Sequence, residues 1–166
     1  MTHLRGERKV TIPGTDDDDA VRAMGYVAIY AASLEEAAGE CFHLLRELDP
    51  HERRGDPWQA TLRIESSVRA LGALPPNDAL TEIRGTLDEA RRLLTERNVA
   101  MHSALFASPN CGMERVTRNP TRANSYVAAE QVYNLAERIS VVEQQLRAGV
   151  AMLPRLIHEV RVAQRR

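Results

Sequence analysis

The chain has 166 residues, of which 43% are hydrophobic, 27% charged and only 4% aromatic, and its formal net charge at pH 7 is −1. This balance is typical of one globular domain with a buried core, and it excludes a disordered chain or a general nucleic-acid coat. No stretch approaches the roughly 20 apolar residues that cross a bilayer, the start of the chain has no apolar signal segment, and two cysteines are too few for a disulfide framework, so we expect a reduced, cytoplasmic protein without a membrane partner.

Residues 1–14 are polar and contain glycine and proline, which predicts a flexible tail before a single domain over residues 15–166. A helix is expected to begin at Thr15 or Asp16, because either can cap the first turn and the following carboxylates meet the positive end of the helix dipole. The four consecutive aspartates are not expected to bind a metal, since consecutive side chains fan around a helix instead of converging.

Apolar side chains at three- and four-residue steps predict one stripe over residues 24–48 of this first helix, ended by the turn sequence DPHERRGDP. A second helix is expected near Asp56, with Pro57 at its first helical position and Trp58 in its apolar stripe. A third helix is expected to follow the turn sequence GALPPND and to run through LLTERNVAMHSALF.

The last helix is expected to start near Ser125 or Tyr126, after the irregular stretch ASPNCGMERVTRNPTRANS, in which MERVT could be a short extended piece. Its apolar residues over 132–163 form a heptad-like seam that suits packing in a bundle or against a second copy. Pro154 predicts a kink in this helix or a break into a short terminal helix. The four stripes together predict an all-α, up-and-down four-helix bundle with a long kinked C-terminal helix.

Three polar residues, Arg97, Asn98 and His102, stand in the third helix where the flanking pattern has apolar side chains. On a straight helix Arg97 and His102 lie about 140° apart around the axis and about 7.5 Å apart along it. Asn98 and His102 stack one turn apart. If Arg97 and His102 share one site, we expect a distorted helix or a two-fold homodimer that brings two sets of these groups into one cleft.

A purely structural role is the alternative interpretation of Arg97, because a half-buried arginine is costly unless it is paired. Glu65 in the second helix, and Glu35 or Glu36 in the first, lie beside the apolar stripes of their helices and could form that pair.

The segment RNVAMH, residues 97–102, resembles the R-x4-H signature of HEPN domains, small α-helical bundles found in bacterial toxin–antitoxin, phage-defence and CRISPR-associated ribonucleases. The polar Asn98 and the small Ser103 are also similar to that family, and the architectural resemblance covers roughly residues 20–150. Some HEPN toxins carry a tyrosine two residues after the histidine, which a partner nucleotidyltransferase modifies. Here that position is Ala104, so this particular antitoxin pairing is in doubt.

The resemblance implies metal-independent cleavage of RNA, in which the 2′-hydroxyl attacks the adjacent phosphorus and leaves a 2′,3′-cyclic phosphate and a 5′-hydroxyl. His102 would transfer the proton, a contribution of about 10²–10⁴ in rate. Arg97 would contact the phosphate and stabilise the charge that builds on it. Asn98 would orient His102 or the phosphate, and Glu36 or Glu65 could hold Arg97 or His102 in place. No cofactor or metal is expected, because the histidines show no metal-ligand spacing.

Basic residues in two predicted loops could form the positive rim of an RNA cleft. They are Arg53 and Arg54 before the second helix, and Arg115, Arg118 and Arg122 after the motif helix.

The resemblance further implies a homodimer, an RNA substrate and a possible antitoxin protein. Two other functions stay open at this point. One is a non-catalytic HEPN-like module that binds RNA or a nucleotide. The other is a helical oligomerisation or adaptor protein, in which Arg97 and His102 make only hydrogen bonds and the seam of the last helix is the working surface.

Overall fold

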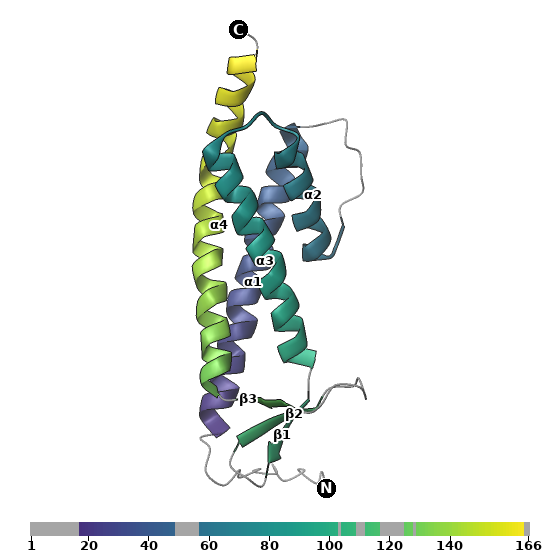
Figure 1. Ribbon diagram of the computed structural model, residues 1–166, viewed down its shortest axis with the longest axis vertical. Helices are drawn as coiled ribbons and strands as arrows, with labels where there is room; N and C mark the ends of the chain where they lie inside the picture. The colour runs from purple at the N-terminus through teal and green to yellow at the C-terminus, as the bar shows by residue number, and fades with distance from the viewer. Residues whose placement is uncertain are drawn as a thin grey trace, which may run out of the picture.

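Figure 1 shows the computed structural model of the chain. The structure describes the backbone of residues 17–48, 57–102, 104–108, 112–116, 125–127 and 129–164, and the surroundings of side chains within 22–46, 57–101 and 130–163. The tail predicted over residues 1–14 lies outside the described residues.

Four helices pack together along most of their length (Figure 1). They are α1 (Asp17–Leu48), α2 (Ala60–Gly72), α3 (Asp78–His102) and α4 (Ala129–Gln164). The long C-terminal helix α4 contacts both α1 and α3. The predicted all-α architecture of four helices is therefore confirmed. Within the described residues no helix combines the length and the apolar character needed to cross a membrane.

The directions of the helices do not strictly alternate, because α1, α2 and α4 run one way and α3 runs the other (Figure 1). Cross-helix contacts agree: Ser33 of α1 donates to Glu143 of α4 at 2.8 Å, and one turn further along both helices Arg147 donates to Glu36 at 2.8 Å. The 11 residues between α1 and α2 make this possible. Fully extended, they span about 36 Å, whereas α2 is only about 20 Å long.

The start of α3 is where the sequence predicts it. The side-chain oxygen of Asn77 accepts a hydrogen bond from the backbone N–H of Leu80 at 3.1 Å, which is the usual N-cap arrangement. The prediction for α2 is wrong by one turn, because α2 begins at Ala60 and Pro57 precedes it. Gln59 is the residue before the first turn, in an extended conformation and without a side-chain cap.

A three-stranded antiparallel sheet lies at the end of the bundle where α3 ends and α4 begins (Figure 1). Its strands are β1 (Ala104–Ser108), β2 (Gly112–Val116) and β3 (Ser125–Val127), in the order β1-β2-β3. Only the piece MERVT, close to β2, was anticipated from the sequence. Because β3 occupies Ser125–Val127, α4 begins at Ala129, and the predicted helix start at Ser125 or Tyr126 is wrong.

The core is built from the apolar stripes of all four helices. Helix α4 continues through Pro154 to Gln164, so the predicted break into a separate terminal helix is wrong. Leu153 and Ile157 on either side of the proline are fully buried, and this burial holds both halves of α4 against the bundle. Gly149 lets α3 and α4 approach closely, since Ile83 of α3 lies directly beside its backbone.

Candidate functional site

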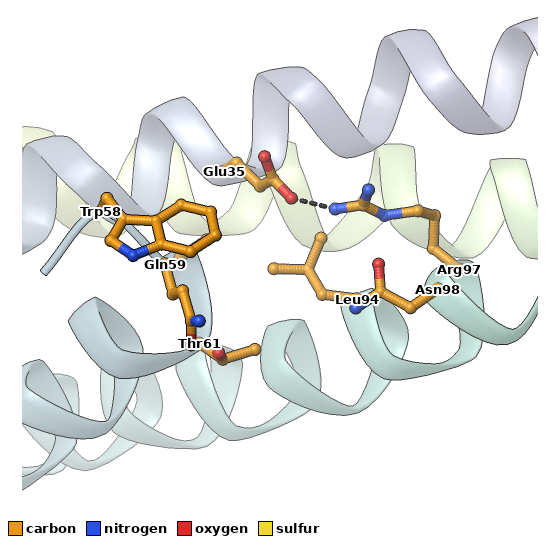
Figure 2. A pocket seen from close by; sticks show the side chains of 8 residues that line it. Glu35, Trp58, Gln59, Thr61, Leu94, Arg97 and Asn98 are labelled. Carbon is orange, nitrogen blue, oxygen red and sulfur yellow. Dashed lines mark hydrogen bonds and ion pairs between the residues drawn. The ribbon is translucent and has the colours of Figure 1, made fainter. Parts of the chain in front are cut away.

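Arg97 of α3 reaches across to α1, where its Nη2 group pairs with the carboxylate of Glu35 (Figure 2). The side chain of Arg97 is 23% exposed and that of Glu35 is 39% exposed, so the pair is half-buried. One of the partners considered from the sequence is therefore the partner observed. The pair joins α3 to α1 and also leaves part of the guanidinium at the surface.

The guanidinium of Arg97 is only partly satisfied by this contact. Its Nε–H is covered and donates to no acceptor in the part of the chain that the structure describes. A covered donor without a partner costs about 1–3 kcal/mol. A ligand that drew the guanidinium into a fuller set of hydrogen bonds would remove that cost.

A hollow of about 530 Å³ lies between α1, α2 and α3, beside this ion pair (Figure 2). It is lined by residues from three separate segments: Glu35, Trp58, Gln59, Ala60, Thr61, Leu94, Arg97 and Asn98. Figure 2 shows Trp58 at one end of the hollow and Arg97 with Asn98 at the other, with Leu94 between them. Two of the three predicted catalytic residues, Arg97 and Asn98, thus share one surface depression.

His102 is the last residue of α3, and its side chain lies outside the described part of the structure. Helix α3 is α-helical without interruption from Asp78 to His102. Position 102 is therefore one turn beyond Asn98 and about 140° around the axis from Arg97. No distortion in the described helix brings positions 97 and 102 onto one face, which leaves the homodimer as the predicted way to combine them.

The supporting carboxylates predicted from the sequence are engaged elsewhere. Glu36 pairs with Arg147 of α4 at 2.8 Å, and Glu65 pairs with Arg91 of α3 at 3.5 Å. Glu35, rather than Glu36 or Glu65, therefore holds Arg97. That Glu36 or Glu65 holds His102 stays a prediction, because the side chain of His102 lies outside the described residues. Consecutive helical residues point about 100° apart, so Glu35 is directed to α3 while Glu36 is directed to α4.

The predicted basic rim falls almost entirely outside the described residues. Arg115 belongs to β2, where its backbone lies opposite Leu105 of β1 and Ser125 of β3. Its side chain is outside the described part. The other four arginines proposed for the rim lie outside it altogether: Arg53, Arg54, Arg118 and Arg122.

A second charged cluster fastens α1 to α4 on another face of the bundle. Arg147 contacts Glu36, Glu40 and Glu143, and it donates to the hydroxyl of Ser33 at 3.1 Å. Burial raises the pKa of Glu143, but hydrogen bonds from Arg147 and Ser33 outweigh it and hold the pKa below its ordinary value. Hydrogen bonds from Arg147 to Glu143 and Glu36 raise the pKa of the guanidinium in turn. We interpret this cluster as structural.

The thiol of Cys41, the described cysteine, is not in a reactive environment. Cys41 is fully buried in α1, and burial raises the pKa of its thiol to about 12 despite an opposing hydrogen bond with Ser67. Among the described residues no three histidine, cysteine or acidic side chains gather in a way that could hold a metal ion.

Trp58 is the residue of this site that the sequence pattern misplaced. It was predicted in the apolar stripe of the second helix, whereas it precedes α2 and is 84% exposed at the edge of the hollow. Its neighbour Gln59 also lines the hollow and was not singled out.

Comparisons with protein families, with curated proteins and with solved structures found nothing that matches this chain. The resemblance to HEPN domains therefore rests on the residues of α3 and on the helical architecture.

Proposed function

We propose that the protein is a metal-independent endoribonuclease of the HEPN type, which cleaves RNA to a 2′,3′-cyclic phosphate and a 5′-hydroxyl. The observation that supports this most is the joint position of Arg97 and Asn98 in one hollow, on an uninterrupted helix that continues to His102.

Arg97 is the proposed phosphate ligand. A guanidinium carries five N–H donors in a planar fork, and the contact with Glu35 is made through Nη2 alone. A phosphodiester in the hollow is expected to accept hydrogen bonds from the guanidinium N–H groups that do not contact Glu35. Glu35 would then continue to neutralise part of the positive charge of Arg97. Bidentate guanidinium–phosphate contacts of this kind are short and directional, so they also orient the scissile bond.

His102 is the proposed group for proton transfer. Attack of the 2′-hydroxyl on phosphorus releases one proton, and departure of the 5′-oxygen takes one up, so the reaction needs a base and an acid. A homodimer in which two α3 helices meet would supply two imidazoles, one for each step. Asn98, one turn before His102, is suited to orient the imidazole or the phosphate.

The cellular setting follows only from the resemblance. A toxin or phage-defence ribonuclease that is restrained by an antitoxin protein is the setting we propose, and a homodimer is its proposed active form.

The test is cleavage of mixed RNA by the purified chain in the presence of EDTA. Wild type is expected to cleave, and His102→Ala and Arg97→Ala are each expected to abolish cleavage. His158→Ala removes an exposed histidine of α4, and Arg138→Ala removes an arginine whose ion pair with Glu96 also joins two helices, at 2.9 Å. Both controls are expected to keep full activity, so equal loss in the controls would contradict the proposal.

A non-catalytic RNA-binding module is the second candidate, and the Arg97–Glu35 pair favours it, because a guanidinium already partly neutralised stabilises a transition state less. Wild type that is inert but binds RNA in a salt-sensitive way, with weaker binding by Arg97→Ala, would support this function. An adaptor role would be supported if neither substitution affected RNA and both only lowered the melting temperature or split the oligomer.

A further inference from the structure

The most exposed large hydrophobic side chain in the described residues is Trp58, at 84%. An indole offers a wide apolar face, and tryptophan is on average a well-buried residue. Here it stands at the edge of a polar hollow, at the opposite end from Arg97 (Figure 2). The exposed ring is therefore placed to contact a ligand that fills the hollow.

The backbone on both sides of Trp58 is held in place. Nε of Arg63 donates to the carbonyl of Pro57 at 2.7 Å. The carbonyl of Gln59 accepts from the backbone N–H groups of Leu62 and Arg63 at 3.1 and 3.2 Å. An aromatic ring on a fixed stretch of backbone loses little conformational entropy when a ligand covers it, which is a property of good binding residues.

The remaining lining of the hollow suits one nucleotide. Gln59 and Asn98 provide amide donors and acceptors that match the edge of a base, and Thr61 provides a hydroxyl. Arg97 provides a cation for a phosphate, and Leu94 an apolar floor. The volume of about 530 Å³ lies in the range of small-ligand sites.

A flat aromatic face at the edge of the hollow favours an unpaired base over a paired one. Bases within a duplex are stacked on their neighbours, whereas bases of a single strand are free to stack on aromatic side chains. Such stacking tolerates any base, because each has a π-face. The charge of the described lining supports the same distinction. Arg97 is its one cation and Glu35 offsets that charge, so these lining residues lack the dense positive charge that tracks a duplex.

We propose that Trp58 is a stacking platform for an unpaired nucleobase of single-stranded RNA, with the adjacent phosphate at Arg97. This inference rests on the proposed function and specifies its substrate as single-stranded RNA. Trp58 is a binding residue here and takes no part in proton transfer.

The test uses the fluorescence of Trp58, which is the only tryptophan of the chain. The His102→Ala variant is titrated with a single-stranded oligoribonucleotide, so that the RNA stays intact. Saturable quenching of the indole is expected. Trp58→Ala in the same background is expected to bind this RNA about 5- to 150-fold more weakly, measured by anisotropy of a labelled strand, and Trp58→Phe should retain most of the affinity.

Two controls make the result specific. Leu62→Ala removes another exposed apolar side chain, 44% exposed on α2 and outside the hollow, and should leave RNA affinity unchanged. A duplex of the same sequence is expected to cause no quenching. Free AMP is expected to bind far more weakly than the strand, so equal affinity for AMP would overturn the assignment of the ligand as RNA.

The outcomes separate this inference from the proposed function. Unchanged fluorescence and unchanged affinity of Trp58→Ala would overturn the stacking proposal even if wild type cleaves RNA. Quenching and a matching loss of affinity would support it even if wild type proves inert. A Trp58→Ala variant that binds RNA normally but changes its oligomeric state would overturn it as well, because the ring would then face a second copy.

Discussion

Gly149→Ala tests whether α3 and α4 are packed as closely as the structure shows. A Cβ atom at position 149 would lie 2.8 Å from Cγ1 and 3.4 Å from Cδ1 of Ile83. Ile83 is only 4% exposed and is branched at Cβ, so it has few other rotamers to adopt. Overpacking of a core typically costs about 1–3 kcal/mol, and replacing a helical glycine by alanine gains about 1 kcal/mol.

The contact with Ile83 is expected to outweigh the gain in helix propensity. Gly149→Ala should therefore lower the free energy of unfolding by about 1 kcal/mol and the melting temperature by about 2–4 °C. Gly85→Ala in α3 is the matched control, because nothing lies within 4 Å of the added Cβ, and it should raise the free energy by about 1 kcal/mol. Urea and thermal unfolding followed by circular dichroism measure both. Equal stabilisation by the two substitutions would refute the close approach.

Three further predictions concern the helix cap, the acid stability and the buried thiol. Asn77→Ala removes the N-cap of α3 and should cost about 1 kcal/mol in urea unfolding, with no loss if the cap is not formed. The pKa of Glu143 is lowered in the folded state, so the stability it gives is present above its ordinary pKa of 4.5 and is lost as the pH falls below that value. Glu143→Gln should therefore make the free energy of unfolding fall less steeply as the pH drops below 4.5. An unchanged pH dependence would argue against the pairing with Arg147. Because burial raises the pKa of Cys41 to about 12, its thiol in a Cys111→Ser variant should react with a thiol reagent at neutral pH only as the protein unfolds, and fast labelling of the native protein would contradict the burial.

The helical core could be predicted because its signal is local and periodic. Val27, Leu34 and Cys41 of α1 recur every seven residues, which is about two turns, and all are fully buried. The same holds for Ile139 and Leu146 of α4. The start of α3 was equally predictable, because the cap is a contact between residues three positions apart.

The parts that could not be predicted depend on contacts between distant residues. Trp58 reads as the first turn of a helix, but the helix begins later, where the Gln59 carbonyl accepts its first N–H groups and Arg63 bonds to the carbonyl of Pro57. Similarly, Glu35 and Glu36 look alike in the sequence, and only the placement of α3 and α4 around α1 determines which of them meets Arg97.

The three strands could not be predicted because of the composition of the segment that contains them. The stretch between α3 and α4 is rich in asparagine and proline, which predicts turns, and each strand is only three to five residues long. Pairing between strands, as in the register of Glu114 with Tyr126, depends on contacts between residues that are far apart in the sequence. The local pattern of such short segments does not predict it. The direction of α2 was missed for a related reason, since the length of its connection permits either orientation.

The central claim is that Arg97 and His102 act on a phosphodiester through its neighbouring 2′-hydroxyl. Its most direct test is a pair of single-stranded RNA oligonucleotides in EDTA, identical except for a 2′-deoxy substitution at the mapped cleavage position. We predict that wild type cleaves the all-ribose strand to a 2′,3′-cyclic phosphate and a 5′-hydroxyl and leaves the substituted position intact. Cleavage of both strands at that position, or of neither, would contradict the account.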